Sequence, residues 1–210
     1  MDNKSALIVI DMQNGFINEA SAQCIKGAAA TVPTLASVIS NCRERGIPVF
    51  FVTRIYRADG SDVEHTRFES WLRGGKSLSP GCAEEISDAM PEEFGECERD
   101  YHIIKPRFSA FFHTELDLML RRLGIDTVIL TGTTTPNCIR TTCYDAISLE
   151  YNVVVIEDCT SSATPQIQSA NILDMKNIGA QILSSAEFIG GAELLDSVGT
   201  VRAAVKKAEA

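Results

Sequence analysis

The sequence lacks any apolar run of the roughly 18 residues that a membrane-spanning helix needs. Its first apolar run, residues 6–10, is short and ends on an aspartate. The first four residues also lack the basic and then apolar profile of a secretion signal. We therefore expect a protein that has no membrane partner and works in the cytoplasm.

An excess of positive charge is also missing. The 210 residues include 19 Lys and Arg against 28 Asp and Glu, for a net charge of -9. Binding to nucleic acid depends on clustered Lys and Arg that neutralise phosphates. The composition therefore predicts no nucleic-acid partner and favours a small molecule as the ligand.

Paired cysteine motifs are absent as well. The chain has seven cysteines, an odd number, and none of them forms a C-x-x-C pair. This pattern favours free thiols in a reducing compartment over a disulfide framework or a zinc site. Because a free cysteine usually behaves as a small apolar side chain, most of the seven are expected in the core.

Short apolar runs alternate with helical stretches, which predicts an α/β protein with a parallel sheet. An apolar content of 45% and the chain length fit one globular domain over residues 1–210. The predicted strands are residues 6–11, 48–53, 102–105, 127–131, 153–156 and 180–183. The predicted helices are residues 30–45, 114–123, 137–150, 165–179 and 193–210.

Residues 55–101 interrupt this alternation. The segment is rich in glycine and proline, and it contains the only tryptophan, Trp71. We predict one short helix near residues 83–90. Long excursions in compact domains are often lids or binding loops, so this segment is expected to shape the substrate site.

Three reactive residues fall at the ends of predicted strands. Asp11 ends the first strand, Lys105 ends the third, and Cys138 follows the fourth. Taken singly, each has a structural explanation: an aspartate can cap a helix, a lysine can end a strand in solvent, and a cysteine can fill the core. Ligands of open parallel sheets bind beyond the carboxyl ends of the strands, however, so we expect the three residues to converge on one site.

These residue types suit nucleophilic catalysis. The ordinary thiol pKa of about 8.5 falls near a cation or a helix N-terminus, and Cys138 is predicted to have both. Asp11 would accept the thiol proton and return it to the departing nitrogen. Backbone N–H groups of residues 132–137 would hold the oxyanion, each contributing about 2.7–4 kcal/mol.

The chain resembles the isochorismatase-like cysteine hydrolases from residue 6 to about residue 188. Three segments carry this resemblance in order: LIVIDMQNGF at residues 7–16, KPRFSAF at residues 105–111 and LTGTTTPNC at residues 130–138. The resemblance implies a three-layer αβα fold with a six-stranded parallel sheet of Rossmann-like topology. It also implies that family members form homodimers or homotetramers, which we expect here.

The resemblance further implies functional roles. The catalytic triad would be Asp11, Lys105 and Cys138. A cis peptide bond would join Thr133 to Thr134, and the N–H groups of Thr134 and Cys138 would form the oxyanion hole.

Within the family, the chain resembles the amidohydrolase branch. Metal-dependent nicotinamidases carry an Asp-x-His pair after the second strand, whereas residues 53–59 contain none, so neither a metal nor another cofactor is expected. Residues 105–111 resemble ureidoacrylate and N-carbamoylsarcosine amidohydrolases. This implies hydrolysis of the C–N bond of a small linear amide, ureide or carbamoyl compound through a thioester on Cys138. Two alternatives remain open: a vinyl-ether hydrolase of the isochorismatase type, and a ligand-binding member without activity.

Candidate substrate-binding residues complete the hypothesis. Small-molecule pockets are mostly apolar with a few placed polar groups. An arginine can hold a substrate carboxylate through two parallel hydrogen bonds. The expected apolar walls are Phe16, Trp71 and Phe108, and the candidate arginines are Arg54, Arg57 and Arg107.

Overall fold

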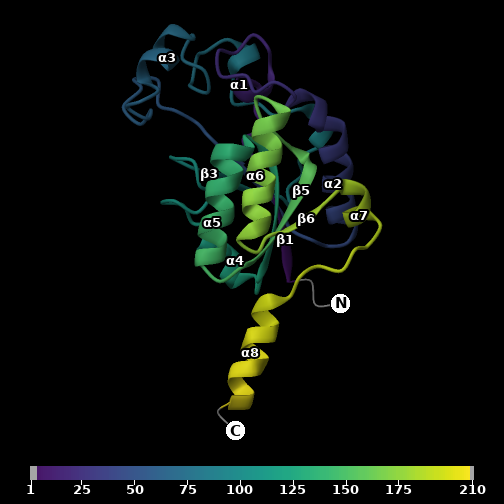
Figure 1. The fold of residues 1–210 in the computed structure, drawn as a ribbon. Helices are drawn as coiled ribbons and strands as arrows, with labels where there is room; N and C mark the ends of the chain where they lie inside the picture. The colour runs from purple at the N-terminus through teal and green to yellow at the C-terminus, as the bar shows by residue number, and fades with distance from the viewer. Residues whose placement is uncertain (1–3, 209–210) are drawn as a thin grey trace.

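The computed structural model describes residues 4–208 and is built around six parallel strands (Figure 1). The strands are β1 (Ser5–Ile10), β2 (Val49–Thr53), β3 (Tyr101–Ile104), β4 (Thr127–Thr133), β5 (Asn152–Ser161) and β6 (Gln181–Leu183). Their order across the sheet is β3-β2-β1-β4-β5-β6, and every neighbouring pair is parallel. The predicted six-stranded α/β sheet is therefore confirmed.

The side chains of β1 show why the sheet must be covered on both faces. Ala6, Ile8 and Ile10 point into one apolar core, and Leu7 and Val9 point into another. Successive side chains of a strand alternate between faces, so a continuous apolar run needs a helical layer on each side.

Helices supply both layers (Figure 1). The first core is closed by α4 (Leu116–Arg122), α5 (Arg140–Ser148) and α6 (Pro165–Asn177). The second is closed by α1 (Asn14–Ile17), α2 (Val32–Glu44) and α7 (Ser185–Ile189). A short 3₁₀ turn, η1 (Ala29–Thr31), leads into α2.

The excursion between β2 and β3 folds over the carboxyl ends of the strands. It contains α3 (Phe68–Arg73) and the 3₁₀ turns η2 (Glu84–Ile86) and η3 (Glu92–Phe94). The predicted helix near residues 83–90 is therefore only the turn η2, and α3 was not predicted. Figure 1 shows α1 and α3 together at the end of the molecule opposite the N-terminus.

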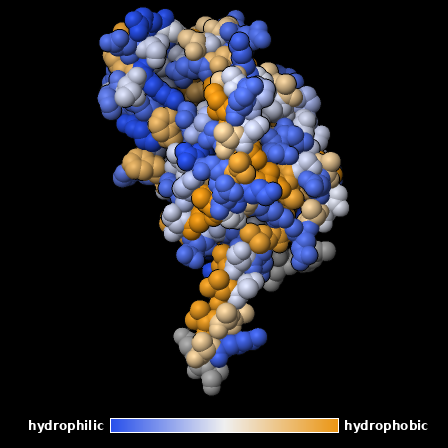
Figure 2. Space-filling view, viewed as in Figure 1, coloured by the Kyte–Doolittle hydropathy of each residue, from blue (hydrophilic) through white to orange (hydrophobic). Residues whose placement is uncertain are grey.

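The last helix, α8 (Ser197–Ala208), extends away from the rest of the molecule (Figure 1). None of its residues is buried, and Val201 and Val205 are exposed. Figure 2 shows apolar surface along this helix. Over residues 4–208, no helix has the length and apolar character needed to cross a membrane.

Candidate active site

The sheet topology brings three chain segments to one point. The strand order reverses between β1 and β4, which is where open parallel sheets bind ligands. Asp11 follows β1 and Lys105 follows β3. Cys138 lies in η4 (Thr135–Ile139), a π-helical turn that connects β4 to α5.

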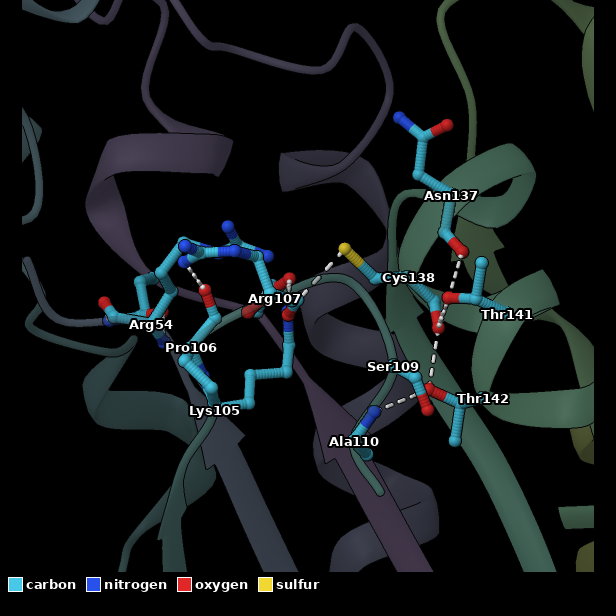
Figure 3. Close-up of polar contacts among 12 residues, drawn as sticks. Arg54, Lys105, Pro106, Arg107, Ser109, Ala110, Asn137, Cys138, Thr141 and Thr142 are labelled. Atoms are coloured by element: carbon cyan, nitrogen blue, oxygen red, sulfur yellow. Dashed lines mark hydrogen bonds and ion pairs between the residues drawn. The ribbon is translucent and has the colours of Figure 1, made fainter. Parts of the chain in front are cut away.

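The three side chains meet in the protein interior. Lys105 Nζ lies 2.7 Å from Asp11 Oδ2, and it donates a hydrogen bond of 3.5 Å to Cys138 Sγ (Figure 3). The exposed fractions of Asp11, Lys105 and Cys138 are 1%, 0% and 4%. Lys105 also donates to the carbonyl of Arg107 at 3.0 Å, which fixes the direction of the ammonium group. The convergence expected from the strand ends is thus present.

Thr142 connects the segment after β3 to the turn that contains Cys138. The backbone N–H of Ala110 donates to Thr142 Oγ1 at 2.9 Å, and Thr142 Oγ1 donates to the Cys138 carbonyl at 2.6 Å (Figure 3). The peptide bond between Thr133 and Thr134 is cis, as the resemblance implies, and both residues line the same cavity as Cys138.

The Asp11 carboxylate has unused acceptor capacity. Its backbone adopts a left-handed conformation with φ of 53°, and its N–H donates to the Val52 carbonyl at 2.9 Å. Apart from the Lys105 ammonium and the Cys138 thiol, no donor within residues 4–208 serves either carboxylate oxygen, although both are buried. Such an oxygen is suited to take a proton from a neighbouring thiol.

The surroundings of the Cys138 thiol favour its protonated form. Burial raises its pKa, the Asp11 carboxylate raises it further, and Lys105 and Arg54 lower it without outweighing these effects. Lys105 lowers this pKa, as expected, but the net shift is upward because the loss of water penalises the thiolate more strongly. The thiol needs a proton acceptor at the moment of attack, and Asp11 is adjacent.

A cavity of about 270 Å³ opens onto the sulfur. The predicted wall residue Phe16 lines it, together with Thr134 and Cys138. Three polar residues that were not predicted, Gln23, Arg67 and Ser70, line it as well, and so does Asn137.

Trp71 requires a correction. Its ring is buried in a small apolar core of the excursion with Phe16, Tyr56 and Leu78, and its Nε1 donates to the Ser77 carbonyl at 2.9 Å. Trp71 does not line the cavity at Cys138. Its size and apolar contacts place it in the core that supports α3.

The predicted arginines already interact with other groups of the protein. Arg54 is fully buried and donates to Glu64 and to the Tyr56 hydroxyl. Although burial opposes its charge, Asp11 and its other acidic neighbours raise its pKa. Arg107 donates to the carbonyls of Asp62 and Pro106, at 2.9 and 2.6 Å.

Neither Arg54 nor Arg107 lines the cavity at Cys138. Arg57 is exposed and lies 3.6 Å from Asp59. Phe108 lines a neighbouring hollow with Arg107, and the guanidinium carbons of Arg54 and Arg67 lie 5.5 and 4.7 Å from its ring centroid. Of the predicted substrate-binding residues, only Phe16 lines the cavity at Cys138.

Residues 4–208 contain no group of three or more His, Cys, Asp or Glu side chains that could hold a metal ion. All seven cysteines are free.

A comparison with known proteins identifies related sequences. A family model described as the isochorismatase domain matches residues 5–187. The chain is 45% identical over 181 residues to a protein of Arabidopsis thaliana named probable inactive nicotinamidase, covering 84% of this chain and 90% of that protein. It is 31% identical over 205 residues to the ureidoacrylate amidohydrolase RutB of Pantoea ananatis, covering 88% and 80%.

Solved structures show the same architecture. The isochorismatase family protein from Desulfovibrio vulgaris matches with a TM-score of 0.82 at 38% sequence identity. The match covers 89% of this chain and 96% of that chain.

Proposed function

The chain belongs to the isochorismatase family of hydrolases, and from this premise we propose that it is a cysteine-dependent amidohydrolase. Its substrate would be a small linear amide, ureide or carbamoyl compound, cleaved at a C–N bond. The observation that carries the proposal is the buried contact of Asp11, Lys105 and Cys138 at the mouth of a cavity.

The first half of the reaction forms a thioester. Asp11 accepts the thiol proton as Cys138 Sγ attacks the substrate carbonyl carbon. The N–H groups of Thr134 and Cys138 hold the resulting oxyanion. The C–N bond then breaks, and the ammonia or amine leaves with the proton from Asp11.

The second half regenerates the thiol. Water attacks the thioester carbonyl while Asp11 accepts its proton, and that proton returns to the departing thiolate. The acid or carbamate is released. Lys105 contacts both the Asp11 carboxylate and the sulfur, so it holds the two groups in position throughout the reaction. Its positive charge offsets the negative charge that they share.

Ammonia release tests this proposal. We expect the protein to release ammonia from at least one member of a panel of linear amides, ureides and N-carbamoyl amino acids, and Cys138→Ala to lose that activity by about 10³-fold or more. Substantial residual turnover by Cys138→Ala would exclude the thioester mechanism. Activity on isochorismate that survives Cys138→Ala but not Asp11→Ala would instead identify a vinyl-ether hydrolase.

A second candidate function is ligand binding without turnover. The observation in its favour is the name of the Arabidopsis relative, which describes that protein as a probable inactive nicotinamidase. A binding protein has no need for a carboxylate with unused acceptor capacity beside a buried thiol, so the triad geometry favours the enzyme. Selective alkylation of Cys138 by iodoacetamide near neutral pH would favour the enzyme, whereas equally slow alkylation of all seven cysteines would favour the binding protein.

We also propose that the chain works in the cytoplasm as a homodimer or homotetramer. The seven free cysteines support a reducing compartment. The exposed valines of α8 support an interface. Sedimentation of the purified chain tests the assembly.

A further inference from the structure

We propose that Arg67 binds a carboxylate of the substrate, so that the site selects anionic ureido or amido acids over neutral amides. This inference rests on the proposed function, since it names the substrate class for the nucleophile Cys138. It assigns to Arg67 the role that the sequence assigned to Arg54, Arg57 or Arg107.

The position of Arg67 suits this role. It stands immediately before α3, half-buried, and it lines the same cavity as Cys138 and Asp11. Its guanidinium carbon lies 4.7 Å from the centroid of the Phe108 ring. Packing against an aromatic ring fixes the guanidinium plane and leaves its N–H edge available for two parallel hydrogen bonds to a carboxylate.

The charge of Arg67 is not neutralised by its neighbours. Within residues 4–208 its side chain forms no ion pair and donates no hydrogen bond. It makes a cation–π contact with the Phe108 ring. Glu64, three residues earlier, forms an ion pair with Arg54 and accepts a hydrogen bond from the Tyr56 hydroxyl. Asp11 forms an ion pair with Lys105. Among the described residues that line the cavity, Arg67 is therefore the unpaired cation.

Gln23 provides an independent observation at the same cavity. Its Oε1 is buried and accepts no hydrogen bond within residues 4–208, although the residue lines the cavity. A buried acceptor without a donor is unfavourable, and a substrate N–H would satisfy it. The lining thus offers a nucleophile for a carbonyl carbon, an acceptor for an N–H and a cation for a carboxylate. An N-carbamoyl or ureido acid carries all three complementary groups.

Alkylation of Cys138 tests the charge preference without any turnover. Iodoacetate and iodoacetamide react with a thiol by the same displacement of iodide, but only iodoacetate carries a carboxylate. We expect Arg67→Gln to lower the ratio of iodoacetate to iodoacetamide labelling at Cys138 by about tenfold, measured on the isolated peptide by mass spectrometry. The iodoacetamide rate alone should change little, which separates a lost charge from a misfolded site.

Arg73→Gln is the matched control. Arg73 is the last residue of α3, the helix that Arg67 precedes; its side chain is 77% exposed and pairs with Glu69 at 3.5 Å. Its replacement should leave the labelling ratio unchanged. An equal ratio in the unmodified chain and Arg67→Gln would overturn the inference, whatever the outcome for turnover.

Steady-state kinetics with N-carbamoylglycine and its neutral amide provide the second test. We expect Arg67→Gln to lower kcat/KM by about 100-fold for the acid and only slightly for the amide, with partial recovery in Arg67→Lys. Equal losses on both compounds, or none, would exclude Arg67 as the anchor while the proposed function stands. If the unmodified chain hydrolyses no compound of the wider panel, the proposed function fails, and the labelling ratio still decides on Arg67.

Discussion

Replacing Lys105 with methionine tests the buried ion pair that organises the site. Lys105 Nζ lies 2.7 Å from Asp11 Oδ2, and the two side chains are 0% and 1% exposed. Methionine retains most of the side-chain volume but removes the charge, so the buried Asp11 carboxylate loses the one cation that contacts it among residues 4–208 and keeps only the more distant Arg54. Breaking such a pair costs about 3–5 kcal/mol. With a urea dependence of about 2 kcal/mol per molar, the unfolding midpoint should fall by about 2 M.

The exposed pair of Lys4 and Asp126 provides the control. Its charged atoms are 3.9 Å apart and the Lys4 side chain is 59% exposed, so Lys4→Met should cost only about 0–1 kcal/mol. Adding Asp11→Asn to Lys105→Met removes the orphaned charge and should restore part of the loss. If Lys105→Met is no more destabilising than Lys4→Met, the view that Asp11 depends on Lys105 for its charge is refuted.

Two further predictions concern stability. Burial raises the pKa of Cys42 to about 12 from a model-compound value of 9.0. The unfolded chain therefore loses this proton first, and stability falls as the pH rises from about 9 to 12, by about 1.4 kcal/mol at pH 10. Urea unfolding at pH 8 and pH 10 should show a smaller difference for Cys42→Ala than for the unmodified chain. Gly132→Ala should destabilise the chain by about 1–3 kcal/mol more than Gly27→Ala. A Cβ on Gly132 would lie 2.1 Å from the Ile10 carbonyl oxygen, whereas Gly27 faces open space at a similar positive φ. Equal shifts of the thermal unfolding midpoint in the two variants would contradict this.

The sheet was predictable because continuous apolar runs identify strands that are covered on both faces. β5 shows where this signal ends. The apolar run predicts residues 153–156, but the strand extends through Ser161. Glu157 and Asp158 are exposed and break the apolar run, yet β5 continues to pair with β4, where Thr160 lies opposite Gly132. Backbone pairing can continue where the side-chain pattern does not report it.

The convergence of the three candidate catalytic residues was predictable for a related reason. Asp11, Lys105 and Cys138 follow strands whose order in space is set by parallel pairing, so their convergence depends on topology. The pKa of Cys138 was not predictable in the same way, because its direction depends on how completely the thiol is withdrawn from water. Burial of that degree is a property of the assembled structure.

The cavity lining was the least predictable part of the site. Arg67 and Gln23 follow no strand, and the path of residues 55–101 has no periodic pattern that would orient a side chain toward Cys138. Trp71 was misassigned for the same reason: a large aromatic residue in an irregular segment fits either a pocket wall or a local core. Its buried position and the hydrogen bond to Ser77 place it in the core.

The most direct test of the mechanism is to look for an acyl group on Cys138 during turnover. Acid quenching of the protein with a hydrolysed member of the amide and ureide panel, followed by peptide mass spectrometry, should detect the substrate's acyl fragment on the peptide that contains Cys138. The fragment should decay as substrate is exhausted and be missing from Cys138→Ala, which should also release no ammonia. Ammonia release by Cys138→Ala at the rate of the unmodified chain would contradict the role of Cys138 as the nucleophile.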